Sequence, residues 1–188
     1  MKNHSSSSDT PIQLGGQLLL ADPTLREGIF NRSVVLLHEH ELSDGAVGLI
    51  LNKPTGKMVG DFLKGEEFEG IRQLAVHEGG PVEPSQLTFS SFWWSKKLGL
   101  RWAARISAEQ VLRHSAKPGR IVRAFLGYSG WSAGQLESEL SRNSWISLSP
   151  PRDLLNHEHD KRLWAELLKG LSPLHRILAE APEDPFLN

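Results

Sequence analysis

A serine between two glycines is the first candidate for chemistry in this sequence. Gly130-Trp131-Ser132-Ala133-Gly134 fits the pattern G-x-S-x-G, in which a strained turn from a strand into a helix exposes a nucleophilic serine. Possible base and orienting residues follow later in the chain, at His157, His159, His175, Asp153 and Asp160. Ser132 is equally placed to cap a helix by accepting a hydrogen bond from the amide of Gln135. The sequence therefore allows a serine hydrolase and favours a helix cap, with Ser132 as the single candidate for a catalytic residue.

Two His-Glu-His tripeptides are the candidates for metal ligation. In His38-Glu39-His40 the two imidazoles lie on one side if the strand is regular, because side chains alternate along a strand. His157-Glu158-His159 repeats the pattern late in the chain. Imidazole and carboxylate suit zinc, manganese or non-haem iron. Two chance pairs, one at a strand end and one in a polar surface stretch, are the favoured explanation, so we expect no metal and no other cofactor, and keep His38 and His40 as the candidate ligands.

A basic segment is the candidate for nucleic-acid binding. Between positions 96 and 123 there is one acid, Glu109, and eight cations: Lys96, Lys97, Arg101, Arg105, Arg113, Lys117, Arg120 and Arg123. Such a segment can contact phosphates, and no helix-turn-helix pattern accompanies it. Alternatively, it pairs with the acidic first half of the chain: residues 1–94 carry 7 Lys and Arg against 12 Asp and Glu, and residues 95–188 carry 14 against 10.

Glycines and tryptophans provide two further candidate features. Gly79-Gly80-Pro81 could present amides to an anion, but no Gly-Lys-Ser or Gly-Lys-Thr follows, and a tight turn is the favoured interpretation. Trp93 and Trp94 are adjacent, so on a strand they point to opposite faces, and we expect one of them to be partly exposed at an interface or a ligand groove.

The composition restricts the protein class. The 188 residues include no cysteine, which excludes disulfide frameworks, thiol catalysis and zinc ribbons. The net charge of -1 excludes a globally basic nucleic-acid binder. Neither a signal-peptide pattern nor an apolar run of membrane-spanning length is present, so we expect a cytoplasmic protein with no membrane partner.

Alternating strand and helix signals must position these residues. We predict a polar, disordered tail over residues 1–14 and one domain over residues 15–188. Buried-strand patterns occur at Leu18–Ala21, Ser33–His38, Ala46–Leu51, Gln73–His77, Leu87–Trp94, Leu100–Ile106, Ile121–Tyr128 and Trp145–Leu148. Helices are predicted at 59–64, 107–115, 132–143 and 162–171, with capping boxes opening the second and third. The irregular order favours an α+β or mixed α/β fold.

Several sequence motifs together resemble those of the YqgE/AlgH family of bacterial proteins. They are Phe30-Asn31-Arg32-Ser33-Val34-Val35 leading to His40, Gly45 through Pro54, Gly79-Gly80-Pro81-Val82, and Gly127 through Glu137 followed by Asn143 and Trp145. The resemblance covers about residues 16–170. It implies a single α+β domain with a mixed, partly barrel-like β-sheet surrounded by helices. The family has no settled activity, and its label as transcriptional regulators does not rest on a DNA-binding motif.

The most distinctive residues of these motifs are the candidates for ligand binding: Asn31, Arg32, His40, Asn52, Gly80, Pro81, Trp131 and Gln135. If they bind something they should converge on one surface patch, and if they only hold the fold they should be scattered or buried. We expect a non-enzymatic binding or regulatory domain with an unidentified ligand or protein partner, as a monomer or weak homodimer. Nucleic-acid binding through residues 96–123, and a hydrolase or metal-dependent enzyme, are the alternatives.

Overall fold

The computed structural model describes residues 13–26 and 28–181, so most of the predicted N-terminal tail lies outside the described residues. The strands are β1 (Leu18–Ala21), β2 (Val34–Glu41), β3 (Gly45–Ile50), β4 (Pro54–Met58), β5 (Ala75–Glu78), β6 (Val82–Ser95), β7 (Gly99–Ala103), β8 (Arg120–Trp131) and β9 (Trp145–Leu148). The helices are α1 (Val59–Phe62), α2 (Ala108–Ser115), α3 (Gln135–Ser141), α4 (Lys161–Lys169) and α5 (Pro173–Glu180), with 3-10 turns η1 (Glu66–Ile71) and η2 (Leu154–Asn156). None of these helices is long and apolar enough to cross a membrane.

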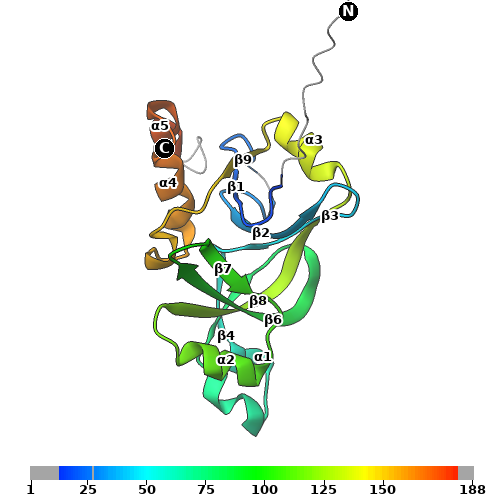
Figure 1. The fold of residues 1–188 in the computed structure, drawn as a ribbon, viewed down its shortest axis with the longest axis vertical. Coiled ribbons are helices and arrows are strands. Elements are labelled where there is room, and N and C mark those ends of the chain that lie inside the picture. The colour runs from blue at the N-terminus through cyan, green and yellow to red at the C-terminus, as the bar shows by residue number, and fades with distance from the viewer. Residues whose placement is uncertain (1–12, 27, 182–188) are drawn as a thin grey trace, which may run out of the picture.

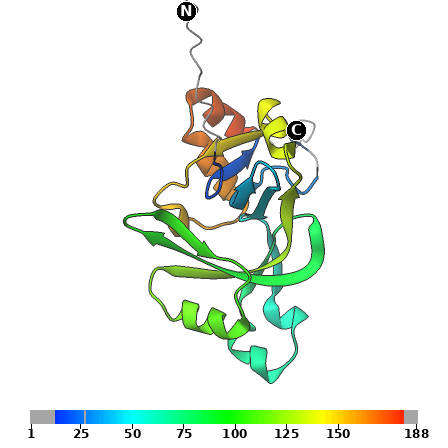
Figure 2. The ribbon, with the colours of Figure 1, turned by 45° about the vertical axis from the view of Figure 1, so that its right-hand side comes forward.

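The long strand β8 joins two halves of one mixed sheet (Figure 1). Its last residues, Ser129 to Trp131, pair with β3, which continues through β2 and β1 to β9 in an antiparallel half. Its earlier residues pair in parallel with β5 and antiparallel with β6, which carries β7. The turned view shows the sheet curling between these halves (Figure 2). The expected α+β fold with a mixed, partly barrel-like sheet is confirmed.

Glycines let the backbones approach closely where the sheet curls. A Cβ atom on Gly79 would lie 2.2 Å from the carbonyl oxygen of Gly127, and one on Gly80 would lie 2.2 Å from the carbonyl carbon of Tyr128. Gly127 itself has φ +66°, a left-handed conformation that favours glycine. The Gly79-Gly80-Pro81 turn is therefore packed against β8, and both of its glycines are buried.

Each half of the sheet is covered by helices because its strands are apolar on the covered faces. On β1, Leu18 and Leu20 face the α4–α5 hairpin, whereas Leu19 faces the opposite side, toward α3. The α4–α5 side includes Trp164, which is fully buried. Around α1 and α2, Val59, Phe89, Val111 and Val122 form a third cluster under the second half of the sheet.

The predicted elements are mostly present, with three differences. Strand β8 continues through Ser129-Gly130-Trp131, for which a turn was predicted, because these residues pair with β3. Strand β4 was not predicted because it is polar and mostly exposed. Helix α5 was also missed, although Ser172 caps it and Pro173 occupies its first turn. The capping box at Ser107 and Gln110 is confirmed in both hydrogen bonds.

Candidate functional site

Helix α3 is attached to the sheet by one carboxylate that accepts three hydrogen bonds. Glu139 Oε2 accepts from the indole Nε1 of Trp131 at 2.9 Å and from that of Trp145 at 2.7 Å. Its Oε1 accepts from the amide of Gln135 at 2.9 Å. Both indole rings are buried and pack edge to face, with Phe30 beside them. This arrangement satisfies buried indole donors that would otherwise destabilise the core.

A second carboxylate of α3 reaches the sheet through a buried histidine. The His40 Nε2 atom lies 2.7 Å from Glu137 Oε1, and its Nδ1 accepts from the amide of Leu14. Burial raises the pKa of Glu137, but the hydrogen bonds from its own amide and from His40, with the His40 charge, lower it overall. We call the whole group the α3 anchor: His40, Trp131, Gln135, Glu137, Glu139 and Trp145.

The two histidines of the first His-Glu-His tripeptide lie on opposite faces of the sheet, contrary to the prediction. A β-bulge between Leu37 and Glu39 adds a residue and reverses the alternation that follows. His38 therefore stacks on Trp102, whereas His40 faces α3. Over residues 13–26 and 28–181, no three histidine or carboxylate side chains gather closely enough to hold a metal ion.

The G-x-S-x-G motif does follow a strand and precede a helix, but the Ser132 side chain neither caps the helix, as was predicted, nor pairs with a histidine base. Helix α3 has Gly134 at its N-cap, with φ 73°. The backbone of Ser132 makes the local bonds: its carbonyl accepts from the Gln135 amide and its own amide donates to Gln135 Oε1. His157, His159 and His175 bond instead to Glu166, to the Leu154 carbonyl and to Ser172.

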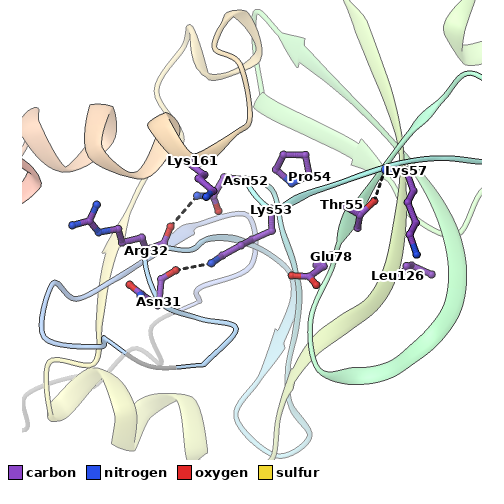
Figure 3. A pocket seen from close by; sticks show the side chains of 10 residues that line it. All are labelled: Asn31, Arg32, Asn52, Lys53, Pro54, Thr55, Lys57, Glu78, Leu126 and Lys161. Atoms are coloured by element: carbon purple, nitrogen blue, oxygen red, sulfur yellow. Dashed lines mark hydrogen bonds between the residues drawn. The ribbon is translucent and has the colours of Figure 1, made fainter. Parts of the chain in front are cut away.

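A cavity of about 520 Å³ opens where the first half of the sheet meets α4 and β4 (Figure 3). Three segments meet there: the β1–β2 loop, the exit of β3 into β4, and the first turn of α4. We call it the basic cavity, and its lining residues are Asn31, Arg32, Asn52, Lys53, Pro54, Thr55, Lys57, Glu78, Leu126 and Lys161. It contains three of the eight candidate ligand-binding residues.

Asn52 holds two walls of the basic cavity together. Its buried side chain accepts from the amide of Val34 at 2.8 Å and donates to the carbonyl of Arg32 at 2.9 Å. Arg32 has φ 52°, uncommon for a residue with a side chain, and its guanidinium points away from the cavity to the Ala181 carbonyl and the Trp164 ring. Asn52 and Arg32 therefore shape the cavity more than they supply its polar groups.

Lysines supply most of the charge that faces the basic cavity. Lys53 Nζ donates to the carbonyl of Asn31 at 2.8 Å across the loop (Figure 3). Lys57 is on the exposed strand β4 and lies against the Phe62 ring, and Lys161 is exposed at the start of α4. Glu78 is the one carboxylate in the lining. Three ammonium groups against one carboxylate give the cavity a positive potential, which suits an anionic ligand.

A buried cationic cluster lies directly behind the strand exit that lines the cavity. The Arg123 guanidinium donates to the carbonyl of Leu51 at 3.2 Å and approaches His77 at 3.5 Å. Burial, with the Arg123 charge adding to it, lowers the pKa of His77 and of His159 to about 4. Burial also lowers the pKa of Arg123 to about 10. The two imidazoles are therefore neutral at pH 7.

The eight residues of the basic segment do not share one surface. Arg123 is in the buried cluster just described, and Arg105 lies over the Tyr128 ring. Lys96 and Lys97 lie in the β6–β7 turn, Arg101 on β7, Arg113 on α2, Lys117 after α2 and Arg120 at the start of β8. Six of the eight therefore remain near one end of the sheet.

The candidate ligand-binding residues divide between two regions. Asn31, Arg32 and Asn52 line the basic cavity, whereas His40, Trp131 and Gln135 belong to the α3 anchor. Gly80 and Pro81 belong to the turn against β8. Sequence reasoning missed Lys57, Glu78 and Lys161 in the cavity and Glu139 in the anchor. For Glu139, the available signal was an acid one helical turn after Gln135, near two tryptophans that each need an acceptor.

The half-barrel sheet with its three helical covers defines a single α+β domain. The sequence profile of the AlgH-like family matches residues 18–174. A UPF0301 protein of Chlorobium phaeobacteroides is 36% identical over 92% of this chain and 95% of its own. One from Bacteroides fragilis is 33% identical over 92% of this chain and 90% of its own. The chain belongs to the AlgH-like family, as the motifs predicted, and these relatives are named by family, not by an activity.

Two solved structures share the fold. The AlgH protein from Pseudomonas aeruginosa, solved in solution, is 27% identical, with a TM-score of 0.62 over 97% of this chain and 99% of that one. A crystal structure of a protein from Corynebacterium diphtheriae has a TM-score of 0.67 over 96% of this chain and 95% of that one. At 17% identity, the second similarity concerns the fold alone.

Proposed function

We propose that the protein is a non-enzymatic binding domain that takes a small anionic ligand in the basic cavity. The observation that carries the proposal is the presence of Lys53, Lys57 and Lys161 in the lining of a cavity of about 520 Å³, with Glu78 as the single carboxylate there. That volume is within the range of small-molecule sites. An anion there gains charge-assisted hydrogen bonds from ammonium groups that the β3–β4 segment and α4 bring together.

The polar groups of the cavity support binding rather than covalent chemistry. The Thr55 hydroxyl donates to the carbonyl of Val76, so it is not paired with a base. Both polar atoms of the Asn52 amide are used within the fold. The remaining groups are ammonium ions and one carboxylate, which recognise charge and orient a ligand.

A regulatory role fits the position of the cavity. A ligand between Lys161 on α4 and Lys57 on β4 would connect the α4–α5 hairpin to the second half of the sheet. The protein would then make different contacts with and without the ligand. A ligand can shift a protein between two states only if such a difference exists. A regulatory role of this protein would therefore consist of a ligand-dependent change in how the α4–α5 hairpin contacts the sheet.

Isothermal titration calorimetry with defined anions tests the proposal. The probes are inorganic phosphate, a nucleoside monophosphate and a dicarboxylate, each titrated at low salt. We expect at least one to bind, and Lys161→Gln to weaken that binding about tenfold because a charge-assisted contact is lost. Lys169→Gln, at the other end of α4, is the matched control, since Lys169 pairs with Glu180 at 3.3 Å away from the cavity.

Two results would overturn the proposal. One is the absence of binding for every probe at millimolar concentration. The other is an affinity in Lys161→Gln equal to that of the Lys169→Gln control, which would place the binding elsewhere. Lys161 is exposed, so its substitution is not expected to unfold the protein.

A further inference from the structure

One end of the second half of the sheet gathers the exposed part of the basic segment. Strand β6 runs antiparallel to both β7 and β8, so the end of β6 lies beside the beginnings of its two neighbours. All three meet on the left in Figures 1 and 2. The β6–β7 turn and the α2–β8 loop extend from the same end. The result is a cationic surface made of Lys96, Lys97, Arg101, Arg113, Lys117 and Arg120.

An aromatic ring lies at the centre of this surface. The strand register places Trp93 between Arg101 on β7 and Arg120 on β8. The guanidinium carbon of Arg120 lies 3.9 Å from the centre of the Trp93 ring, and its Nη1 lies 3.1 Å from Nδ1 of His114. Trp93 and Trp94 are both half-buried, and Trp94 packs on the opposite face against the core. The partial exposure that was expected for one member of the pair is found for both.

The charged side chains of this surface are almost all positive. Glu109 is the single acid between residues 95 and 123, and it is 3.7 Å from Arg113 on the same helix. Burial lowers the pKa of His114, and the charges of Arg120, Lys117 and Arg113 lower it further. Three cations therefore act on one imidazole at this end of the sheet, where they would also act on a phosphate chain.

We propose that this surface, centred on Trp93 and Arg120, binds single-stranded nucleic acid. Stacked tryptophan and guanidinium planes are platforms on which unpaired bases can stack, and the surrounding lysines and arginines contact the phosphates. In a duplex the bases are already stacked, so the Trp93 platform favours a single strand over double-stranded DNA. This surface is separate from the basic cavity and does not rest on the function proposed for it.

Fluorescence anisotropy with a labelled single strand of about 16 nucleotides, the upper end of known site sizes, tests the proposal. We expect binding at low salt that weakens as salt rises. The double variant Lys117→Gln/Arg120→Gln should bind at least about tenfold more weakly, with the salt dependence reduced by about 1.4 for two lost phosphate contacts. Trp93→Ala should weaken binding about tenfold by removing the stacking platform.

Matched controls separate a specific surface from general charge attraction. Arg152→Gln/Arg176→Gln removes the same charge from exposed positions on the other half of the molecule and should bind like the parent protein. If Trp93→Ala does not fold, Lys96→Gln/Lys97→Gln changes only an exposed turn and should still weaken binding. Lack of binding at low salt, an equal loss in the control pair, or equal affinity for duplex DNA or for anionic lipid vesicles would each overturn the proposal.

Discussion

The α3 anchor and the basic cavity both contain distinctive motif residues that hold the fold, but the two regions differ in how their charged groups are matched. In the anchor, the carboxylates of Glu137 and Glu139 are matched by donors from the sheet and from α3 itself. In the cavity, lysines from the β3–β4 segment and from α4 line a space with a single carboxylate. In both regions the distinctive residues hold the fold, and at the cavity the charge toward a ligand comes partly from exposed lysines outside the distinctive motifs, Lys57 and Lys161.

Acidification should give the largest effect, because two buried histidines, His77 and His159, lie near Arg123 behind the strand exit that lines the cavity. Burial holds the pKa of His38, His77 and His159 at about 4, below the ordinary 6.5. Below pH 6.5 the unfolded chain binds protons that the folded chain excludes, so stability falls as the pH drops from 6.5 toward 4. From pH 7 to pH 5 we expect a loss of about 2 kcal/mol per histidine.

Hydrogen exchange measured at pH 7 and pH 5 locates this effect. His77 is on β5 and His159 directly precedes α4, so amides of β5 and α4 should lose protection before those of α3. Earlier loss in α3, or a stability that does not change between the two pH values, would contradict this prediction.

Removal of the Glu139 carboxylate from the α3 anchor should give the next largest loss of stability. Glu139→Ala leaves the buried indole donors of Trp131 and Trp145 without an acceptor, and we expect a loss of about 3 kcal/mol in urea unfolding. Glu109→Ala is the control, because its ion pair with Arg113 is exposed and should contribute less than about 1 kcal/mol. Affinity for an anion in the cavity should not change. Equal losses in the two variants would show that Glu139 does not anchor α3.

The smallest effect is expected at the serine of the G-x-S-x-G motif. The Ser132 side chain is exposed, and the hydrogen bonds of this residue come from its backbone, which alanine keeps. Ser132→Ala should therefore change the free energy of unfolding by less than about 0.5 kcal/mol, as is usual at such positions. A hydroxyl cap would cost about 1 kcal/mol instead. A loss of that size in chemical denaturation would restore the cap interpretation.

Local patterns predicted most of the secondary structure because they depend on neighbouring residues. The Ser107 capping box and the apolar run of β1 are examples, since both signals are complete within a few positions. The bulge after Leu37 was not predictable in this way. It is defined by pairing with β3, and it moved His38 and His40 to different faces.

Only part of the candidate site was predicted, because only some of its residues stand in motifs that can be recognised from neighbouring positions. Asn31, Arg32 and Asn52 were found because they stand in distinctive motifs close together in the sequence. Lys57 and Lys161 were not, because an exposed lysine has no local signature and Lys161 reaches the cavity only after α4 packs on the sheet. Glu139 was missed because its role depends on indole groups from two strands that flank its helix.

The place of β8 between the two halves has a consequence for how the chain can fold. Strands β3, β5 and β6 all pair with β8, so their hydrogen bonds to it cannot form until residues 120–131 have been synthesised. Neither half can complete its hydrogen bonds early during synthesis, because the shared strand comes about two thirds of the way along the chain. A fragment ending before Arg120 would present open strand edges on both halves, which are sites of self-association. We therefore expect both halves of the sheet to complete their pairing only after β8 has been synthesised.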